Sequence, residues 1–479
     1  MAKVRTRFAP SPTGPLHMGN ARTALFNYLF AKQQNGIFIV RVEDTDKERS
    51  KPEWEKDALE NLQALGLEWD EGPTTDGEDR GEYGPYRQSK RTELYTKYLQ
   101  QLLDEDKAYY CFCDPEELEA HRQELSSRGE APKYSGKCKS LSREEQEERI
   151  SSEKSVIRFR VEPKIITFTD LVRGDIPLDM GLVGDTVIAK DPITPLYNFT
   201  VVIDDKEMEI SHVIRGEDHI SNTPKQILLQ KALGFSTPVY AHLPLILAQD
   251  KTKLSKRHGD NSVTRFLDEG YLPVAVINFL ALLGWNPGDE RELFSLSELV
   301  KEFSVEKVHK GGAVFNLQKF EWLNSEYIKK MPLKELTKLC IPYLPQENLP
   351  SEGYLEKAIA LYQDRLKKLS DISGLIDFLL VDTLTYDSQL LSWKGASKEE
   401  RIESLTKSKD ILQEVKESFW TEDTLSKVLL AEAEKDKDRG KLLWPLRVAL
   451  SGKKNSAGPF EIAAVLGKEK TLKRIEKAL

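Results

Sequence analysis

The alternation of apolar and polar positions at the start of the chain predicts a strand, a tight turn and a helix. Residues 4–8 alternate apolar and basic side chains, as a short strand does. Prolines and a glycine interrupt regular structure at 10–15, and residues 21–32 then place apolar side chains at helical spacing. Residues 37–42 predict a buried second strand. In such α/β units ligands bind at the edge where the strands end, which is beside this turn.

The pattern continues as an α/β region that carries an insertion. Helical patterns recur at 54–67, 91–104, 115–125 and 222–233. Apolar runs predict strands at 155–161, 165–170 and 186–189 inside the insertion, and the main sheet is expected to resume with strands at 196–205, 210–215 and 239–246.

After residue 324 the strand-like runs stop and amphipathic helical patterns dominate. These patterns cover 333–344, 354–369, 398–419, 424–435 and 442–450. We therefore expect an α/β domain at 1–324 followed by an all-α domain at 325–479.

Composition and charge are those of a water-soluble globular protein of two or more domains. The chain has 479 residues and a net charge of −8, which argues against an evenly basic surface but allows local patches that bind nucleic acid. The N-terminus lacks an apolar signal core, and the longest apolar run, near 275–285, is too short to span a bilayer. Four cysteines do not make a disulfide framework. We expect a cytoplasmic protein, a monomer without a membrane partner.

The N-terminal turn carries groups that suit a phosphate. The strand–turn–helix order places free backbone N–H groups and the positive end of a helix dipole beside the turn. His17 lies at the predicted helix start and can donate to a phosphate oxygen, while Gly19 leaves space for a base or ribose against the backbone. Taken alone, the pattern also fits a proline-rich turn with a surface histidine.

A second polar loop, residues 250–259, gathers cations and hydroxyls after an apolar strand. Such a loop suits closure over a triphosphate, where it neutralises the charge that grows on a leaving pyrophosphate. As an isolated feature, a lysine-rich loop is more often simply solvated.

Charged residues follow two predicted strands at the same sheet edge. Residues 43–46 carry carboxylates that suit an amino group or a ribose, although the last two can equally cap the next helix. Arg215 closes a later strand and suits bidentate capture of a carboxylate. The alternative for Arg215 is a salt bridge to Glu217 or Asp218.

Three cysteines cluster in the insertion. Cys111 and Cys113 are one residue apart, and Cys138 and Tyr134 follow beyond a predicted helix. Three thiolates and a phenol oxygen can make a tetrahedral Zn²⁺ site. Reduced cysteines without metal remain the alternative, because Cys-x-Cys is a looser signal than paired Cys-x-x-Cys.

Together the two polar loops resemble a known family. Residues 9–14 followed by His-Met-Gly-Asn at 17–20 resemble the HIGH signature of class I aminoacyl-tRNA synthetases in its glutamyl form, and 253–257 resemble their KMSKS loop. Residues 40–46 and 310–316 are also similar to glutamyl-tRNA synthetase segments, in matching order.

The chain departs from these motifs at three positions. Asn20 stands in place of the last His, Leu254 in place of Met, and Arg257 in place of the last Ser. These differences remove one possible phosphate contact but keep His17, Gly19 and both lysines.

The resemblance implies a Rossmann catalytic domain with an acceptor-binding insertion at about 75–190 and a stem-contact region at about 245–324. It implies that L-glutamate and Mg²⁺-ATP form glutamyl-AMP, and that the glutamyl group then moves to the terminal adenosine of tRNA-Glu. Relatives also carry zinc in the insertion. By matching, the catalytic residues are His17, Lys253 and Lys256; the ATP site adds Pro10, Gly14, Gly19, Asn20 and Ser255; and the glutamate site is Arg7, Ser11, Glu43, Tyr197 and Arg215.

The helical half resembles the anticodon-binding half of bacterial glutamyl-tRNA synthetases. The helix expected at 355–369 ends in cations, of which Arg365 is expected to hydrogen-bond an anticodon base edge, while Lys367 and Lys368 contact phosphate. The alternative is a solvent-facing basic helix end.

Other functions stay open at this point. A small-molecule nucleotidylyltransferase shares His-x-Gly chemistry but does not need a helical half of this size. A catalytically silent RNA-binding protein is expected to have lost His17 or Lys256, and both are present. A shorter relative that glutamylates a modified base lacks the helical half. Glutamylation of further tRNAs, such as tRNA-Gln, is compatible with the same motifs.

Overall fold

The computed structural model describes residues 3–255, 257 and 259–479, and it divides into two compact units. The first unit comprises Met1–Asp268 and Pro273–Phe320, and the second comprises Glu269–Leu272 and Glu321–Leu479. Across the described residues, no helix has both the length and the apolar character needed to cross a membrane.

A parallel sheet forms the centre of the first unit. The backbone N–H of Ser211, just before β10, donates to the carbonyl of Arg5 at 3.0 Å, so β10 lies beside β1. The helix α1 (Met18–Gln33) follows β1, which confirms the predicted strand–turn–helix–strand unit. The parallel pairs of this sheet are β1 (Arg5–Phe8) with β2 (Ile37–Val40), and β10 (His212–Gly216) with β11 (Val239–Leu243).

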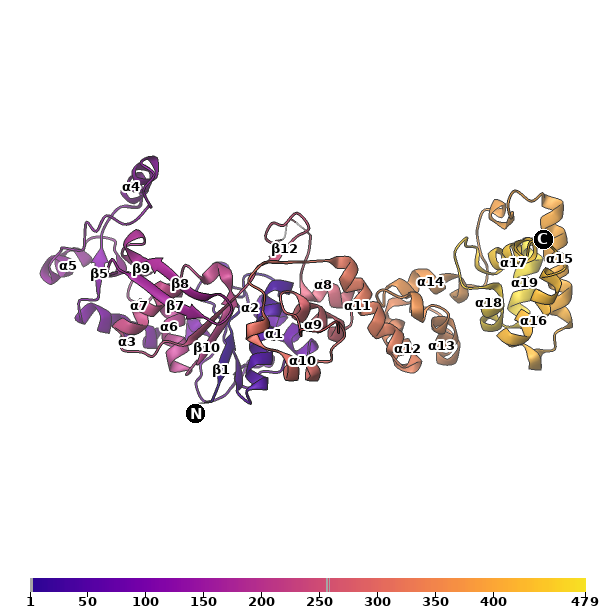
Figure 1. Ribbon diagram of the computed structural model, residues 1–479, viewed down its shortest axis with the longest axis horizontal. Helices are drawn as coiled ribbons and strands as arrows, with labels where there is room; N and C mark the ends of the chain where they lie inside the picture. Colours follow the sequence, from indigo (N-terminus) through magenta and orange to yellow (C-terminus); the bar gives the residue numbers. More distant parts are fainter. Residues whose placement is uncertain (1–2, 256, 258) are drawn as a thin grey trace. The chain divides into compact units, whose positions relative to one another are not determined.

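The insertion between β2 and β10 brings a second, antiparallel sheet, in the order β5-β6-β9. A hairpin of β7 and β8 joins the main sheet through Asp170, which pairs with Tyr240 of β11. Figure 1 shows α4 and α5 at the outer end of this insertion, away from α1. From β2 to the end of this insertion the chain forms α2 (Pro52–Ala64), β3 (Gly72–Pro73), β4 (Asp79–Arg80), α3 (Thr92–Asp104), β5 (Ala108–Cys111), α4 (Pro115–Ser127), α5 (Arg143–Ile150), β6 (Val156–Phe159), β7 (Ile165–Asp170), β8 (Gly174–Asp179) and β9 (Thr186–Ala189).

One apolar core ties the insertion to the nucleotide-binding sheet. Buried side chains from β2, α3, β6, α6 and α7 pack in the same cluster, for example Ile39, Leu99, Ile157, Phe199 and Leu229. The rest of the first unit consists of α6 (Tyr197–Glu207), α7 (Thr223–Ala232), β12 (Ile246–Leu247), α8 (Val263–Asp268), α9 (Pro273–Leu282), α10 (Leu296–Glu302), β13 (Ala313–Val314) and the start of α11 (Leu317–Lys330).

The second unit is helical in all its described regular elements, as the sequence predicts. Helices α15, α17 and α19 pack against one another, and α18 lies against α16 and α17. Its helices are α12 (Leu333–Cys340), α13 (Glu352–Ala360), α14 (Asp371–Leu380), α15 (Lys398–Glu414), α16 (Glu422–Ala433), α17 (Gly440–Ser451), α18 (Pro459–Leu466) and α19 (Lys468–Ala478).

The strand expected at 196–205 is wrong, because this segment forms the helix α6. Phe199 to Ile203 is an apolar, partly β-branched run that is buried almost without interruption. A buried helix and a buried strand give the same apolar run, so periodicity does not separate them. Two acidic residues complete the buried stretch, Asp204 and Asp205, and both accept hydrogen bonds from arginines.

The helix expected at 354–369 is also too long, because α13 ends at Ala360 and a separate 3₁₀ turn covers Gln363–Arg365. The side chain of Gln363 explains the break. Its amide donates to the carbonyls of Ile328 and Met331, both at 2.9 Å, and so it satisfies the end of α11. Arg365 therefore lies in a short turn and not at the end of a long helix.

Candidate active site

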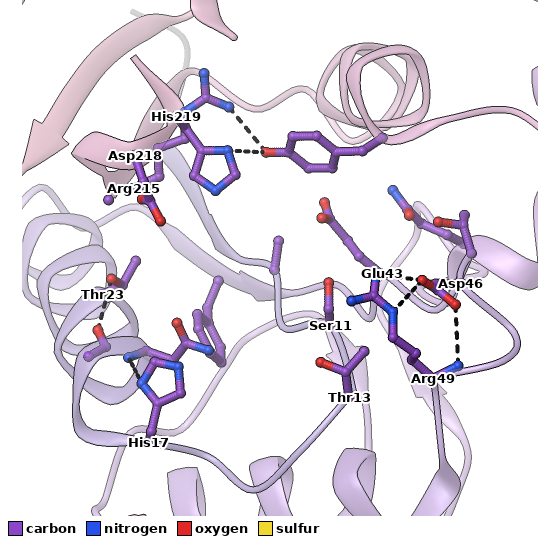
Figure 2. Close-up of a pocket in the computed structure, with 18 of the residues that line it drawn as sticks. Ser11, Thr13, His17, Thr23, Glu43, Asp46, Arg49, Arg215, Asp218 and His219 are labelled. Carbon is purple, nitrogen blue, oxygen red and sulfur yellow. Dashed lines mark hydrogen bonds and ion pairs between the residues drawn. The ribbon is translucent and has the colours of Figure 1, made fainter. Parts of the chain in front are cut away.

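A cleft of about 1150 Å³ opens at the carboxyl edge of the central sheet. Residues from the N-terminal turn, from the ends of β2 and β10 and from the lysine-rich loop line it together. Figure 2 shows His17 on one side, Arg215 and His219 across from it, and Glu43 at the flank. Of the residues expected in the site, those that line the cleft are Arg7, Ser11, His17, Gly19, Asn20, Glu43, Tyr197, Arg215, Lys253 and Ser255.

The turn holds the imidazole of His17 at the start of α1. His17 is the N-cap of this helix, and its Nδ1 accepts from the backbone N–H of Asn20 at 3.3 Å. The proton of a neutral ring therefore lies on Nε2. A Cβ on Gly19 would lie 3.2 Å from this ring, so glycine makes room for the imidazole as well as for a ligand.

Backbone pairing joins the turn to the segment after the lysine-rich loop. The N–H of Met18 donates to the carbonyl of Asn261 at 3.0 Å, and the N–H of Val263 donates to that of Leu16 at 2.8 Å. In the loop itself, Nζ of Lys253 lies 3.0 Å from Oδ2 of Asp218. The expected second lysine, Lys256, lies outside the described residues. The two polar loops thus belong to one site, as their chemistry predicts.

Arg215 at the end of β10 is 5% exposed and is held by neutral acceptors. Its Nη2 donates to the Thr223 hydroxyl and to Oε1 of Gln226, both at 2.8 Å. Its Nε donates to Nε2 of His242 at 3.2 Å, and Nη1 donates to the Tyr197 hydroxyl at 3.4 Å. Among the described residues, these hydrogen bonds use four of the five guanidinium N–H groups and bring no carboxylate to Arg215.

The alternative salt bridge of Arg215 is therefore wrong. Glu217 is paired with Arg173, and Asp218 is paired with Lys253. A buried guanidinium without a carboxylate partner leaves a positive charge at the cleft wall, which favours an anionic group of a ligand.

A buried ion network positions Arg7 and Glu43. Asp205 accepts from Nε of Arg7 at 3.0 Å and from Nη1 of Arg41 at 2.7 Å, while Nη2 of Arg41 donates to Glu43 at 3.1 Å. Burial acts to raise the pKa of Asp205, but Arg7 and Arg41 hold that pKa below its usual range. Burial raises the pKa of Glu43 against the opposing effect of the same arginines. Arg7 and Glu43 thus present opposite charges to one cleft.

Two residues expected in the ATP site do not line this cleft. Pro10 and Gly14 line a separate small cavity behind the turn, beside Trp54 and Leu59, and do not line the cleft described here. Pro10 contributes through its backbone, since its carbonyl accepts from the N–H of Glu43 at 2.9 Å. Its place in the structure is therefore to fix the end of β2.

The acidic segment after β2 faces the cleft and does not cap a helix. The next helix, α2, has Lys51 at its N-cap position and begins with Pro52. Asp46 instead pairs with Arg49 at 2.6 Å, and Thr45 and Asp46 both line the cleft. The capping interpretation of this segment is wrong.

The cysteine cluster of the insertion fits a zinc ion. The sulfurs of Cys111, Cys113 and Cys138 all lie within 4.8 Å of one another, and those of Cys113 and Cys138 are 3.6 Å apart. Tetrahedral thiolates with Zn–S bonds of about 2.3 Å place their sulfurs about 3.8 Å apart. The Tyr134 hydroxyl lies 3.4 Å and 3.5 Å from the first two sulfurs, so the predicted four-residue set forms one cluster.

In the second unit, Arg365 is exposed and its Nη1 donates to the carbonyl of Ser456 at 3.3 Å. Lys367 pairs with Glu321 at 2.8 Å and Lys368 with Glu269 at 2.7 Å. The two lysines are therefore engaged by carboxylates, whereas Arg365 keeps a hydrogen bond to a neutral carbonyl.

Sequence reasoning did not find several residues that shape the cleft. His219 lies 3.1 Å from the Tyr197 hydroxyl through Nδ1, and burial together with the nearby Arg215 lowers the pKa of His219 to about 4. Thr223, Gln226 and His242 hold Arg215. The acidic run around His219 was one available signal, but the others are separated from Arg215 along the chain.

Comparisons with known proteins agree with this architecture. Residues 3–322 match the family described as tRNA synthetases class I (E and Q), catalytic domain, and residues 335–479 match the anticodon binding domain family. Glutamate–tRNA ligase 1 of Caldicellulosiruptor saccharolyticus is 45% identical over 99% of this chain and 98% of its own. Glutamate–tRNA ligase of Carboxydothermus hydrogenoformans is 44% identical over 98% and 99%.

A solved structure resembles the whole chain. The crystal structure of a glutamate tRNA ligase from Elizabethkingia meningosepticum, in complex with its amino acid, is 36% identical with a TM-score of 0.89, and the match covers 100% of this chain and 99% of that one. The match of both family descriptions, in order and over nearly the full length, shows that this chain belongs to the class I aminoacyl-tRNA synthetases, in the group described as E and Q, with a C-terminal anticodon-binding domain.

Proposed function

We propose that this protein is a glutamate–tRNA ligase. It activates L-glutamate with ATP and transfers the glutamyl group to the terminal adenosine of tRNA-Glu. The names of relatives that match over their full lengths support this function. The observation that carries it within the site is Arg215, a buried cation whose hydrogen-bond partners among the described residues are all neutral.

Charge complementarity explains a preference for glutamate. Arg215 and Arg7 offer positive charge to the side-chain and α-carboxylates, and Glu43 offers negative charge to the α-ammonium group. Tyr197 and Ser11 add hydroxyls to the same wall. Glutamine lacks the side-chain charge, so it would leave the Arg215 guanidinium without a counterion in a buried site.

The first step joins the two substrates. A glutamate carboxylate oxygen attacks the α-phosphorus of ATP, the bond to the bridging oxygen breaks, and glutamyl-AMP and pyrophosphate form. The Nε2 proton of His17 and the ammonium of Lys253 stabilise the charge that develops on phosphate oxygens, with Lys256 as the proposed second lysine. Gly19, Asn20 and Ser255 complete this side of the cleft, and bound Mg²⁺ would neutralise phosphate charge.

The second step moves the glutamyl group. A ribose hydroxyl of the terminal adenosine attacks the carbonyl carbon of glutamyl-AMP, and AMP leaves with the bonding electron pair. We assign the insertion at about 75–190 to the acceptor end of tRNA, the region at about 245–324 to its stem, and the helical unit with Arg365 to the anticodon. Such an enzyme works in the cytoplasm, and a cleft built from one chain suits a monomer.

We further propose that Cys111, Cys113, Cys138 and Tyr134 hold a structural Zn²⁺. The ion would tie the loop after β5 to the segment around residue 138 and so fix the outer part of the insertion. The chemistry of the donor set supports this assignment, since thiolates are the ligands that zinc prefers in structural sites.

Charging purified tRNA-Glu and tRNA-Gln with labelled glutamate tests the function. Acid-stable label on tRNA-Glu is the expected result. Preference for glutamine or another amino acid would show the substrate assignment to be wrong. Label on both tRNAs would assign the broader, non-discriminating activity, and nucleotide transfer to a small molecule without tRNA would favour a nucleotidylyltransferase.

A further inference from the structure

Two buried residues behind Arg215 form a chain that ends in the insertion. Nδ1 of His242 lies 2.7 Å from Oδ2 of Asp170, and Nε2 of the same ring accepts from Nε of Arg215 at 3.2 Å. His242 is fully buried, and Asp170 is 2% exposed. The histidine therefore connects a carboxylate of β7 to the guanidinium at the cleft wall.

We propose that His242 is a positioning residue for glutamate binding, and that Asp170 fixes the ring tautomer in which His242 accepts a hydrogen bond from Arg215. This inference rests on the proposed function. Neither residue lines the cleft, so both act through Arg215.

The hydrogen bonds that Asp170 accepts determine the tautomer of His242. Asp170 is an acceptor on all sides: Oδ1 receives the N–H groups of Val172 and Arg173, and Oδ2 receives the backbone N–H of His242 at 2.9 Å as well as its ring. The ring must therefore donate from Nδ1, which leaves the lone pair of Nε2 to accept. The opposite tautomer would set an N–H against the N–H of Arg215.

The charge state of the ring agrees with this assignment. Burial lowers the pKa of His242, and Arg215 and Arg173 lower it further, against the opposing effect of Asp170. A neutral ring can accept from Arg215, whereas an imidazolium beside the guanidinium would repel it. The Thr223 hydroxyl also lies within hydrogen-bond distance of Nε2 of His242, at 3.0 Å.

These hydrogen bonds set the orientation in which Arg215 meets a carboxylate of the ligand. The Nε atom of Arg215 donates to His242, and its Nη2 donates to Thr223 and Gln226. These bonds fix the orientation of the guanidinium plane and leave the Nη1 edge toward the cleft. Figure 2 shows Arg215 at this wall beside His219. Bidentate or end-on capture of a carboxylate depends on the orientation of that plane. Loss of the His242 acceptor should weaken glutamate binding without altering the ATP side.

Two replacements of His242 distinguish the roles of its two ring nitrogens. His242→Gln places an amide oxygen near the position of Nε2 and keeps an acceptor for Arg215, whereas His242→Asn keeps only a donor toward Asp170. We measure charging of tRNA-Glu by the full-length protein, with glutamate, ATP and tRNA varied in turn. We expect His242→Asn to raise the KM for glutamate about 10-fold or more, in line with loss of a charge-assisted hydrogen bond, and to change the KM for ATP less than about 2-fold. His242→Gln should recover most of the loss.

The role of Asp170 is tested by a double-variant cycle. Asp170→Asn removes the acceptor that selects the tautomer, and it should raise the KM for glutamate in the parent chain. In the His242→Gln background the same change should add little, because glutamine needs no tautomer selection. Equal effects in both backgrounds would show that Asp170 acts independently of His242.

Phe168→Leu is the control for general loss of packing. The Phe168 ring lies against His242, with centroids 6.1 Å apart, and it carries no polar atom that could hydrogen-bond Arg215. It should lower the thermal midpoint without raising the KM for glutamate. If His242→Asn folds and keeps the parent KM, or raises the KM for ATP equally, the proposal is overturned; if it does not fold, the cycle with His242→Gln decides. Failure of the parent chain to charge glutamate would instead overturn the proposed function.

Discussion

Lys253 and Asp218, which both line the cleft, form an ion pair with Nζ 3.0 Å from Oδ2. Their side chains are 58% and 48% exposed, so water screens the attraction and the pair is worth at most about 1 kcal/mol. A phosphate group that enters the cleft can therefore compete for the ammonium at small cost. The ion pair therefore keeps the Lys253 ammonium at the cleft wall but allows it to move to a bound phosphate.

Replacing Lys253 should affect rate far more than stability. We expect Lys253→Ala to lower the rate of glutamate activation about 10²-fold, because one preorganised donor to the transition state is lost. Unfolding free energy should change by less than about 1 kcal/mol. The measurement is ATP–pyrophosphate exchange with tRNA present.

Lys32→Ala is the matched control for this experiment. Lys32 pairs with Asp70 at 2.7 Å, and neither residue lines the cleft described here. The change removes a lysine–aspartate ion pair that is more buried than the Lys253 pair, and it should leave the exchange rate unchanged. An equal loss of rate in both variants would assign the effect of Lys253 to folding.

The two functions of His17 can be separated by side-chain choice. Asparagine is a good N-cap but has no group at the position of Nε2, whereas alanine neither caps nor donates. We expect His17→Asn and His17→Ala both to lower the activation rate about 10²-fold. Only the alanine variant should also lose about 1 kcal/mol of stability, measured by denaturant unfolding. A fully active His17→Asn variant would show that His17 only caps α1.

Metal content tests the cysteine cluster. Protein purified without chelator should carry about one Zn²⁺ per chain, and Cys113→Ser should release it. Burial raises the pKa of the Cys113 thiol to about 12 in the metal-free cluster, so zinc must displace its proton on binding. Zinc affinity should therefore fall as pH falls, which competition with a chelator at two pH values can measure.

Cys340→Ala is the control for the metal experiment. Cys340 is fully buried, but it lies in α12 of the other unit, outside the cluster. Its replacement should leave the zinc content unchanged. A metal-free protein with full charging activity would leave the cluster as ordinary reduced cysteines.

His219 should make the first unit less stable in mild acid. Its pKa is lowered to about 4 in the folded protein, chiefly by burial, against about 6.5 when unfolded. The unfolded chain therefore binds a proton first, and stability is lost as pH falls from about 6.5 toward 4. Between pH 7 and pH 5 this effect amounts to at most about 2 kcal/mol.

Comparing the parent chain with His219→Gln at these two pH values isolates that effect. Glutamine does not titrate, so the variant should lose less stability on acidification. The same drop in thermal midpoint for both proteins would show that His219 does not contribute.

The local parts of the site were predictable from the sequence. His17 and Lys253 lie in a turn and a loop that the sequence marks by prolines and by cations, Gly19 lies in the first turn of α1, and all three line the cleft. Arg215 was predictable because it ends an apolar strand at the ligand-binding edge. Each of these predictions rests on residues that are close together in the sequence, so a sequence pattern is enough to make it.

The supporting groups were not predictable, because tertiary packing brings them together. Asp170 and His242 are 72 positions apart, and only the pairing of β7 with β11 makes them neighbours. The helix α6 was mistaken for a strand, although Tyr197 still reaches the cleft as its first residue. Burial on every side of α6 removed the polar face that would have identified a helix.

The surroundings of Arg365 decide how its role should be tested. Removing everything after Asn324 is a poor experiment, because Asn324 accepts from the N–H of Leu272 at 2.8 Å and donates to the carbonyl of Lys367 at 2.6 Å. Such a truncation cuts through packed structure of the second unit. Single side chains offer a cleaner comparison.

Arg365→Gln should change which tRNA is preferred, and Lys367→Ala should not. An exposed guanidinium with a neutral carbonyl partner can turn to a base edge, so its loss should alter the charging ratio between tRNA-Glu and tRNAs with a different third anticodon base. Lys367 is paired with Glu321, so its loss should weaken the binding of all tRNAs modestly and reduce the salt dependence of that binding. Both are measured as kcat/KM for each tRNA at two salt concentrations. A uniform loss with Arg365→Gln would mean that this arginine contacts phosphate and does not read the base.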